Sequence, residues 1–207
     1  MRRGRFVTVE GPDGAGKSTQ LALLADWLRA QGEDVVTTRE PGGTPAGEAI
    51  RNILLSPDTT LGDRTELLLY LAARAEHVRI VVQPALERGA IILCDRFCDS
   101  TLVYQSMVRG LPLENVLAIN DFATGGLTPD MTFLFDADPV LLAKRLGQRG
   151  GPDRMEQEGL AFQQAVRQGF LTLAARFPER IVILDASQEK HAVFQTMLKA
   201  WEEFIHQ

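Results

Sequence analysis

The 207-residue chain lacks the sequence features of a membrane-spanning or exported protein. It contains no run of 18 or more apolar residues, so we expect no helix that crosses a membrane. The basic N-terminus MRRGRF leads straight into a strand-like run, without the apolar region and small-residue cleavage site of a signal peptide. These absences lead us to expect a soluble, cytoplasmic protein with no membrane partner.

Cysteine and lysine are also scarce. Cys94 and Cys98 stand four residues apart, which is neither a disulfide framework nor a zinc-binding pattern, so we expect both to be buried apolar side chains. The chain has 4 Lys against 18 Arg and a net charge of −5, without a basic stripe. We therefore expect no nucleic-acid partner. Because arginine binds phosphate through a planar fork of donors, the positions of the arginines matter more than their number.

Five short β-branched runs, each followed by a turn or helix signal, predict five strands. The predicted strands are 5–10, 34–38, 90–95, 131–136 and 180–185. Several are apolar almost throughout, as parallel strands covered on both faces are, and four of the five end in Asp or Glu. Acidic groups at the carboxyl ends of parallel strands lie beside the crevice in which ligands bind.

Apolar residues spaced three and four apart predict helices between these strands. The predicted helices are 17–31, 46–55, 64–87, 99–108, 113–124, 139–148, 158–176 and 190–205. The alternation of strands and helices predicts a single α/β domain over residues 1–207. Its three layers would be a five-stranded parallel sheet flanked by helices on both faces.

The segment Gly11–Ser18 matches the pattern G-x-x-x-x-G-K-[ST] at every fixed position, between a predicted strand and a predicted helix. The backbone N–H groups of such a loop turn inward, and the helix N-terminus adds positive potential. Lys17 is expected to reach the β- and γ-phosphates of a nucleotide, and the Ser18 hydroxyl to bind Mg²⁺. We therefore predict a P-loop NTPase fold. The ATP-binding residues of the loop would be Gly11, Pro12, Asp13, Gly14, Ala15, Gly16, Lys17, Ser18 and Thr19.

Asp95 and Arg96 follow the third predicted strand, in CDRF (94–97). Asp95 is placed like the aspartate that orients water around Mg²⁺ in P-loop folds, although a helix N-cap is a serious alternative. Arg96 cannot be explained as a cap. At the carboxyl end of a strand it would face the crevice and favour an anion.

The segment GQRGGPDRMEQEG (147–159) interrupts the regular pattern with Gly, Pro and charge. A plain surface loop and a mobile lid that brings arginines over a site both fit this composition. We favour the lid.

Five segments lie in the order and at the spacing found in bacterial thymidylate kinases. They are VEGPDGAGKSTQ, TREPGGTPAGEAIR (38–51), AARAEHV (72–78), DRFCDSTLVYQ (95–105) and GPDRMEQE (151–158). The chain resembles this family over essentially its whole length, and TREPGGT with DRF…STxxYQ is far more specific than the P-loop alone. The resemblance implies transfer of the γ-phosphoryl group of ATP to dTMP with Mg²⁺, giving dTDP and ADP in dTTP synthesis, and a homodimer.

The resemblance also implies where dTMP binds. Tyr70 and Arg74, which share one helix face, correspond to the thymine site, through ring stacking and donation to a base carbonyl. The family usually has Phe in place of Tyr70, so its hydroxyl needs a partner, and core packing is the alternative for Tyr70. For Arg39, a surface salt bridge is the alternative. The other expected dTMP-binding residues are Asp13, Glu40, Arg96, Ser100, Thr101, Tyr104 and Gln105.

Several roles stay open within the resemblance. Arg145 is similar to the residue that lies on the adenine face of ATP. The expected lid residues are Arg149, Asp153 and Arg154, and we favour Arg149 as the one that acts on the transferring phosphoryl group. The expected catalytic residues are Lys17, Arg96, Arg149 and Asp13. Asp13 would either accept a hydrogen bond from the 3′-hydroxyl of dTMP, as the resemblance implies, or order water on Mg²⁺.

Two other functions compete with this interpretation. A deoxynucleoside kinase would need a carboxylate base, and Glu40 or Asp95 could take that part, although the lid arginines and Arg39 fit a phosphorylated acceptor better. A GTP-dependent switch would read guanine through a late N-K-x-D-type loop. The segment ILDASQ (183–188) carries no such Lys.

Overall fold

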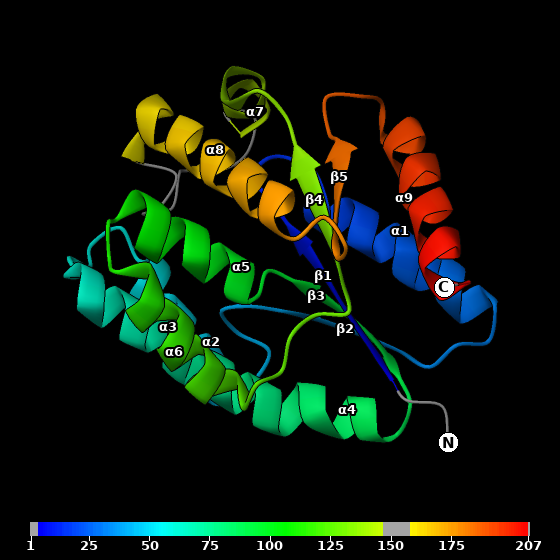
Figure 1. The fold of residues 1–207 in the computed structure, drawn as a ribbon, viewed down its shortest axis with the longest axis horizontal. Coiled ribbons are helices and arrows are strands. Elements are labelled where there is room, and N and C mark those ends of the chain that lie inside the picture. Colours follow the sequence, from blue (N-terminus) through cyan, green and yellow to red (C-terminus); the bar gives the residue numbers. More distant parts are fainter. Residues whose placement is uncertain (1–3, 147–157, 207) are drawn as a thin grey trace.

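The computed structural model describes residues 4–146 and 158–206. Five parallel strands form one sheet in the order β2-β3-β1-β4-β5 (Figure 1). The strands are β1 (Arg5–Glu10), β2 (Val35–Arg39), β3 (Ile91–Asp95), β4 (Met131–Asp136) and β5 (Ile181–Asp185). All five predicted strands are present, and each lies within one residue of its predicted bounds.

Helices cover both faces of the sheet and complete three layers. Helices α1 (Lys17–Ala30) and α9 (Lys190–Ile205) lie together on one face (Figure 1). The larger group on the other face includes α3 (Asp63–His77), α4 (Gln83–Glu87), α5 (Cys98–Thr101) and α8 (Leu160–Arg176). The remaining α-helices are α2 (Pro45–Leu55), α6 (Leu113–Thr124) and α7 (Pro139–Leu146). The predicted α/β class and layer arrangement are confirmed.

Two predicted helices are not α-helical throughout. The prediction for 64–87 was wrong in detail, because the π-helical segment η1 (Val78–Val82) separates α3 from α4. Likewise, α5 passes into the π-helical segment η2 (Leu102–Val108) within the predicted helix 99–108. In a π-helical turn the N–H bonds five residues back, as from Arg109 to the carbonyl of Tyr104 at 2.9 Å. Apolar periodicity does not separate the two helix types, because both present one apolar face.

Strand β1 lies at the centre of the sheet and distributes its side chains to both faces. Val7 and Val9 belong to the apolar cluster that includes residues of α1 and α9, whereas Phe6 belongs to a cluster with η1, α4 and β3. Since successive side chains of a strand point to opposite faces, Phe6, Thr8 and Glu10 share the second face. The carboxylate of Glu10 on this second face lies next to the start of α5.

Two further expectations concern the membrane and the thiols. Within residues 4–146 and 158–206, no helix combines the length and the apolarity needed to cross a bilayer. Cys94 is buried and Cys98 is half-buried, and both are free thiols. Burial raises the pKa of the Cys94 thiol well above its usual range. The expected burial is therefore confirmed for Cys94, whereas Cys98 is only partly buried.

Candidate active site

Two cavities adjoin at the carboxyl ends of the strands. The helix-side cavity, with about 590 Å³ of empty space, lies among residues of α2, α3, α5 and η2. The P-loop cavity, with about 720 Å³, lies over the segment from Asp13 to Thr19. Asp13, Glu40, Arg51 and Arg96 line both cavities, so the two spaces meet at these four side chains.

The predicted phosphate loop joins β1 to α1. A Cβ on Gly11 would collide with the carbonyl oxygen of Phe135 in β4, and the φ of 127° at Gly11 is open only to glycine, so the tight passage requires this residue. Lys17 begins α1 and is 6% exposed. Its Nζ donates to the carbonyls of Gly11 at 3.0 Å and Pro12 at 2.9 Å. Burial, together with the charge of Arg96, lowers the pKa of Lys17.

Ser18 and Asp95 form a pair of oxygen donors beside the loop. The Ser18 hydroxyl donates to Oδ2 of Asp95 at 2.6 Å. Phe97, not Asp95, stands at the N-cap of α5, so the alternative of a cap does not hold. A hydroxyl and a carboxylate suit a hard divalent cation that keeps its other positions for water and phosphate oxygens. In the described part of the chain, no cluster of three His, Cys, Asp or Glu side chains could hold a metal ion.

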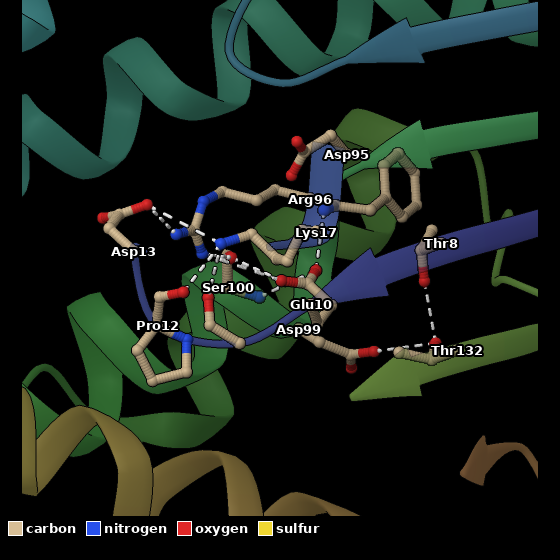
Figure 2. Close-up of polar contacts among 12 residues, drawn as sticks. Thr8, Glu10, Pro12, Asp13, Lys17, Asp95, Arg96, Asp99, Ser100 and Thr132 are labelled. Carbon is tan, nitrogen blue, oxygen red and sulfur yellow. Dashed lines mark hydrogen bonds and ion pairs between the residues drawn. The ribbon is translucent and has the colours of Figure 1, made fainter. Parts of the chain in front are cut away.

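Arg96 stands where the two cavities meet, and Figure 2 shows its side chain beside Asp13, Lys17 and Ser100. Its guanidinium donates to Oδ1 of Asp13 at 2.7 Å and to Oγ of Ser100 at 3.1 Å. It also lies 5.5 Å from the ring centroid of Tyr104. The φ of Arg96 is 70°, and among the described residues it is the one non-glycine position with a positive φ. Residues with a Cβ rarely adopt this conformation, which marks the position as constrained.

Asp13 carries a charge in the middle of the anion-binding loop. It pairs with Arg96 and lies 3.6 Å from Nζ of Lys17. Burial alone would raise the pKa of Asp13, but the charges of Arg96 and Lys17 outweigh it and hold the pKa well below the usual 3.8. The carboxylate is therefore ionised and faces two cations. Its role toward a ligand stays a prediction.

Glu40 is buried between two partners. It accepts from Nε of Arg74 at 2.8 Å and is hydrogen-bonded to Nδ1 of His77, also at 2.8 Å. Arg74 donates from Nη1 to Thr101 at 2.9 Å and to Asn120. The charge of the guanidinium, which is 2% exposed, is thus compensated inside the protein while the residue still lines the helix-side cavity. Sequence reasoning missed both partners: His77 lies in the quoted segment AARAEHV but was given no role, and Asn120 belongs to none of the quoted segments.

The structure brings most of the predicted dTMP-binding residues to one cavity. The helix-side cavity is lined by Asp13, Glu40, Tyr70, Arg74, Arg96, Ser100, Thr101, Tyr104 and Gln105. Tyr104 belongs to the π-helical segment η2, and its hydroxyl has no hydrogen-bond partner within residues 4–146 and 158–206. A buried hydroxyl of this kind is costly unless a ligand supplies the partner.

Two predicted residues, Arg39 and Arg145, lie outside the helix-side cavity. Arg39 lines the P-loop cavity but not the helix-side cavity. It is 54% exposed and pairs with Glu48 at 3.1 Å, which is the surface salt bridge considered as its alternative. Arg145 donates to the carbonyls of Ala186 and Ser187, in the loop after β5. The predicted lid residues Arg149, Asp153 and Arg154 lie outside the described residues.

Arg51 of α2 lines both cavities but was not predicted. Its Nη1 donates to the carbonyl of Pro41 at 2.9 Å, which fixes the guanidinium at the mouth of the site. The available signal was its place at the end of TREPGGTPAGEAIR, the segment that also carries Arg39 and Glu40.

Comparisons with known proteins agree with this arrangement. The family model described as "Thymidylate kinase" matches residues 9–197. A thymidylate kinase of Exiguobacterium sp. (strain ATCC BAA-1283 / AT1b) is 49% identical over 205 residues, which cover 99% of this chain and 97% of that protein. A thymidylate kinase of Pseudomonas fluorescens is 52% identical over 195 residues, or 94% and 93% of the two chains.

Among solved structures, the crystal structure of thymidylate kinase from Ehrlichia chaffeensis matches with a TM-score of 0.78. The two proteins are 33% identical, and the match covers 96% of this chain and 99% of the other. Sequence and fold therefore agree over nearly the whole length. The chain belongs to the thymidylate kinase family.

Proposed function

We propose that the chain transfers the γ-phosphoryl group of ATP to the phosphate of dTMP, giving dTDP and ADP in dTTP synthesis. The observation that carries this proposal is the meeting of the two cavities at Asp13 and Arg96. A donor in the P-loop cavity and a nucleoside monophosphate in the helix-side cavity would bring their phosphates together at one guanidinium.

The donor would bind along the loop from Gly11 to Thr19, with Arg145 toward its adenine. Lys17 now donates to two loop carbonyls, and it would exchange these acceptors for phosphate oxygens when a nucleotide binds. The Lys17 ammonium group would then face the negative charge that develops on the phosphoryl group during transfer. Electrostatic stabilisation of this kind lowers the activation barrier.

The acceptor would bind in the helix-side cavity. Tyr70 would stack on thymine, and Arg74, fixed by Glu40, would donate to the base. Tyr104 would lie against the sugar, where a ligand could satisfy its hydroxyl. The remaining proposed contacts are Arg39, Ser100, Thr101 and Gln105.

The reaction needs positioning and positive charge more than a base. A phosphate oxygen of dTMP is already anionic at neutral pH, so nothing has to deprotonate it. Lys17, Arg96 and Arg149 would screen the repulsion between the two polyanions, with Asp13 holding the acceptor's sugar. Glu40 is engaged by Arg74 and His77, which disfavours it as the base of a deoxynucleoside kinase.

The cofactor in this proposal is Mg²⁺. Ser18 and Asp95 would hold it together with phosphate oxygens of ATP, with Asp95 acting through water. When bound, Mg²⁺ would supply charge neutralisation at the β- and γ-phosphates. The hydrogen bond of 2.6 Å between Ser18 and Asp95 supports this assignment, since it keeps two hard oxygen donors together without a third protein ligand.

Further proposals concern assembly and location. We infer a homodimer, supported by exposed apolar side chains on three neighbouring helices: Ile53 on α2, Leu68 on α3 and Phe122 on α6. Two free thiols suit a reducing, cytoplasmic location. We also infer a single domain over residues 1–207, with a lid at 147–159.

The proposed function is tested by a turnover screen with ATP and Mg²⁺. Nucleoside monophosphates are compared with thymidine, and we expect dTMP to be the preferred acceptor. The variant Lys17→Ala controls for contaminating kinases, and we expect its kcat to fall about a hundredfold or more, with a smaller change in KM for dTMP. Preferred turnover of thymidine would establish a nucleoside kinase instead, and GTP binding without acceptor-dependent turnover would support a switch.

A further inference from the structure

The sheet carries one buried carboxylate that has no part in the reaction described above. Glu10 is the last residue of β1, directly before the phosphate loop, and it is 1% exposed. It lies on the face of β1 that is turned toward α5 (Figure 2). A buried carboxylate is costly to keep, so its hydrogen bonds indicate what it holds.

Both oxygens of Glu10 accept hydrogen bonds from the start of α5. Oε1 accepts from the backbone N–H of Phe97 at 2.7 Å and from that of Ser100 at 3.3 Å. Oε2 accepts from the Ser100 hydroxyl at 2.6 Å. The carboxylate therefore caps the first turn of α5 from another element, a task that the side chain of the N-cap residue Phe97 does not perform.

These bonds fix the two residues that hold Arg96 at its ends: Phe97 next to its backbone and Ser100 next to its guanidinium. Phe97 follows Arg96 directly, and the N–H of Arg96 itself is bonded to the carbonyl of Val9 at 3.0 Å. The uncommon φ of 70° at Arg96 is thus fixed from both sides by β1. At the other end of the side chain, Ser100 accepts from Nη1 of Arg96 while donating to Glu10.

We propose that Glu10 is a positioning residue that holds Arg96 in its phosphate-facing conformation, through the N–H of Phe97 and the hydroxyl of Ser100. Glu10 itself touches no substrate. The inference rests on the proposed role of Arg96 at the phosphate of dTMP. It makes the affinity for that phosphate depend on a side chain inside the sheet.

We expect the reach of the side chain to matter more than its charge, although Oε2 also lies 4.0 Å from Nη1 of Arg96. The charged groups around Glu10 come from several elements and are of both signs: Lys17, Arg74, Arg96, Asp99 and Arg180. Burial and the nearby Asp99 raise the pKa of Glu10 to about 7. A neutral carboxyl group keeps one carbonyl oxygen for the N–H of Phe97 and can donate to Ser100 instead. A glutamine could make the same two contacts.

The test compares two variants that separate reach from charge. Glu10→Asp keeps the charge but is one methylene too short, whereas Glu10→Gln keeps the reach and removes the charge. Calorimetry measures the Kd of dTMP, thymidine and a non-hydrolysable ATP analogue. We expect Glu10→Asp to weaken dTMP binding about tenfold or more, the loss expected for a hydrogen bond to a charged partner, and Glu10→Gln to stay within about threefold of wild type.

Thymidine should bind both variants nearly as tightly as wild type, because it has no phosphate for Arg96 to bind. The ATP analogue should lose much less affinity than dTMP, because the P-loop supplies most of the contacts to its phosphates. Thr8→Val is the matched control: it removes another buried hydrogen bond from the same face of β1, the one of 2.8 Å to Thr132. It should leave all three affinities unchanged. Equal losses of affinity for all three ligands would show that Glu10 is only a structural residue. Weak dTMP binding by Glu10→Gln together with normal binding by Glu10→Asp would show that charge is decisive. Either result overturns the inference.

The outcome for Glu10 is separable from that for the proposed function. Wild-type turnover of dTMP is measured first, and its absence would contradict the function alone. Affinity for inorganic phosphate, measured with ADP present to fill the P-loop cavity, then reports on Arg96 directly. It should follow the same order: wild type, Glu10→Gln, then Glu10→Asp. Equal phosphate affinity in all three proteins would overturn the positioning role of Glu10, whatever the acceptor proves to be.

Discussion

At the residue scale, Asp13 has two cationic partners inside the protein. Its Oδ1 accepts from Arg96, and it lies 3.6 Å from Lys17. A carboxylate in an anion-binding loop would repel phosphates if it stood alone. Because Asp13 lies between two cations, its Oδ1 instead holds the Arg96 and Lys17 side chains in place, and Oδ2 stays available to a hydroxyl donor.

We predict that Asp13→Ala lowers kcat/KM about tenfold to a hundredfold with dTMP, the range that follows from losing a hydrogen bond to a charged acceptor. The loss should be markedly smaller with the 3′-deoxy analogue of dTMP, which lacks the donor. Comparing the two substrates in wild type and variant forms a double-mutant cycle. A loss of equal size with both substrates would show that Asp13 acts on Arg96 and Lys17, or on metal-bound water, rather than on the sugar.

We predict a pH-dependent stability from Glu10. Its pKa in the folded protein is about 7, raised from 4.5. The folded state therefore binds the proton of Glu10 more tightly than the unfolded state does. The resulting contribution to the free energy of unfolding is fully present below pH 4.5 and is lost as the pH rises through 7. Urea unfolding at pH 5 and pH 8 should show wild type losing stability relative to Glu10→Gln. The exposed Glu202→Gln, compared in the same way, controls for surface charge, and a constant difference between wild type and Glu10→Gln would contradict the prediction.

Sequence reasoning predicted the positions of single residues at the site better than their partners. Lys17, Ser18 and Arg96 stand in motifs whose spacing has a physical meaning, so their positions could be predicted. The partners of Arg74 could not, because Glu40 and Asn120 come from distant segments and only folding brings them together. The same holds for Glu10, whose last place in a strand gives no indication of the helix turn above it.

At the element scale, the site depends on how closely η2 packs against α8. Gly169 lies in the interior of α8, and a Cβ there would come within 2.8 Å of Cγ1 of Val103 in η2. Val103 is fully buried. The contact sets the spacing behind Tyr104, the neighbouring residue that lines the helix-side cavity.

We predict that Gly169→Ala destabilises the fold. Alanine favours a helix interior by up to about 1 kcal/mol, but forcing a methyl group against a buried, β-branched side chain costs about 1–3 kcal/mol. We therefore expect a lower unfolding midpoint in denaturant. Gly62→Ala is the control, because its Cβ would meet open space. Stabilisation by Gly169→Ala would show that η2 and α8 can separate without cost.

Elements were predictable to the extent that periodicity defines them. The strands followed from β-branched runs and the helices from apolar spacing. The π-helical segments did not, because an extra residue in one turn leaves the apolar face almost unchanged. Yet η2 carries Tyr104 and Gln105 into the site, so its geometry is a detail that sequence reasoning needed and could not supply.

At the scale of the whole molecule, large apolar side chains are exposed on three neighbouring helices. Helix α3 packs against both α2 and α6, which lie beside it in Figure 1. Phe122 on α6 is 89% exposed and Leu68 on α3 is 61% exposed. Large apolar side chains gathered on neighbouring helices are typical of a surface that another chain covers.

We predict that Leu68→Arg and Phe122→Arg each shift the protein from dimer to monomer, since a buried unpaired charge opposes association. Light scattering should give about twice the chain mass of 22.8 kDa for wild type and the single mass for the variants. Val140→Arg, on the exposed face of α7, serves as the control. A monomeric wild type would contradict the homodimer.

The pairing of Arg180 with Asp99 has a consequence for the timing of biosynthesis. Arg180, just before β5, donates to both oxygens of Asp99 at 2.7 Å, and Asp99 precedes Ser100 in α5. A chain still on the ribosome that has not yet exposed residue 180 would leave Asp99 as a buried charge without this partner, next to Glu10. The phosphate loop emerges early in translation, whereas we expect the helix-side cavity, which α5 lines, to reach its final form only after residue 180 has emerged. Nascent chains should therefore acquire acceptor affinity as one of the last steps of their synthesis.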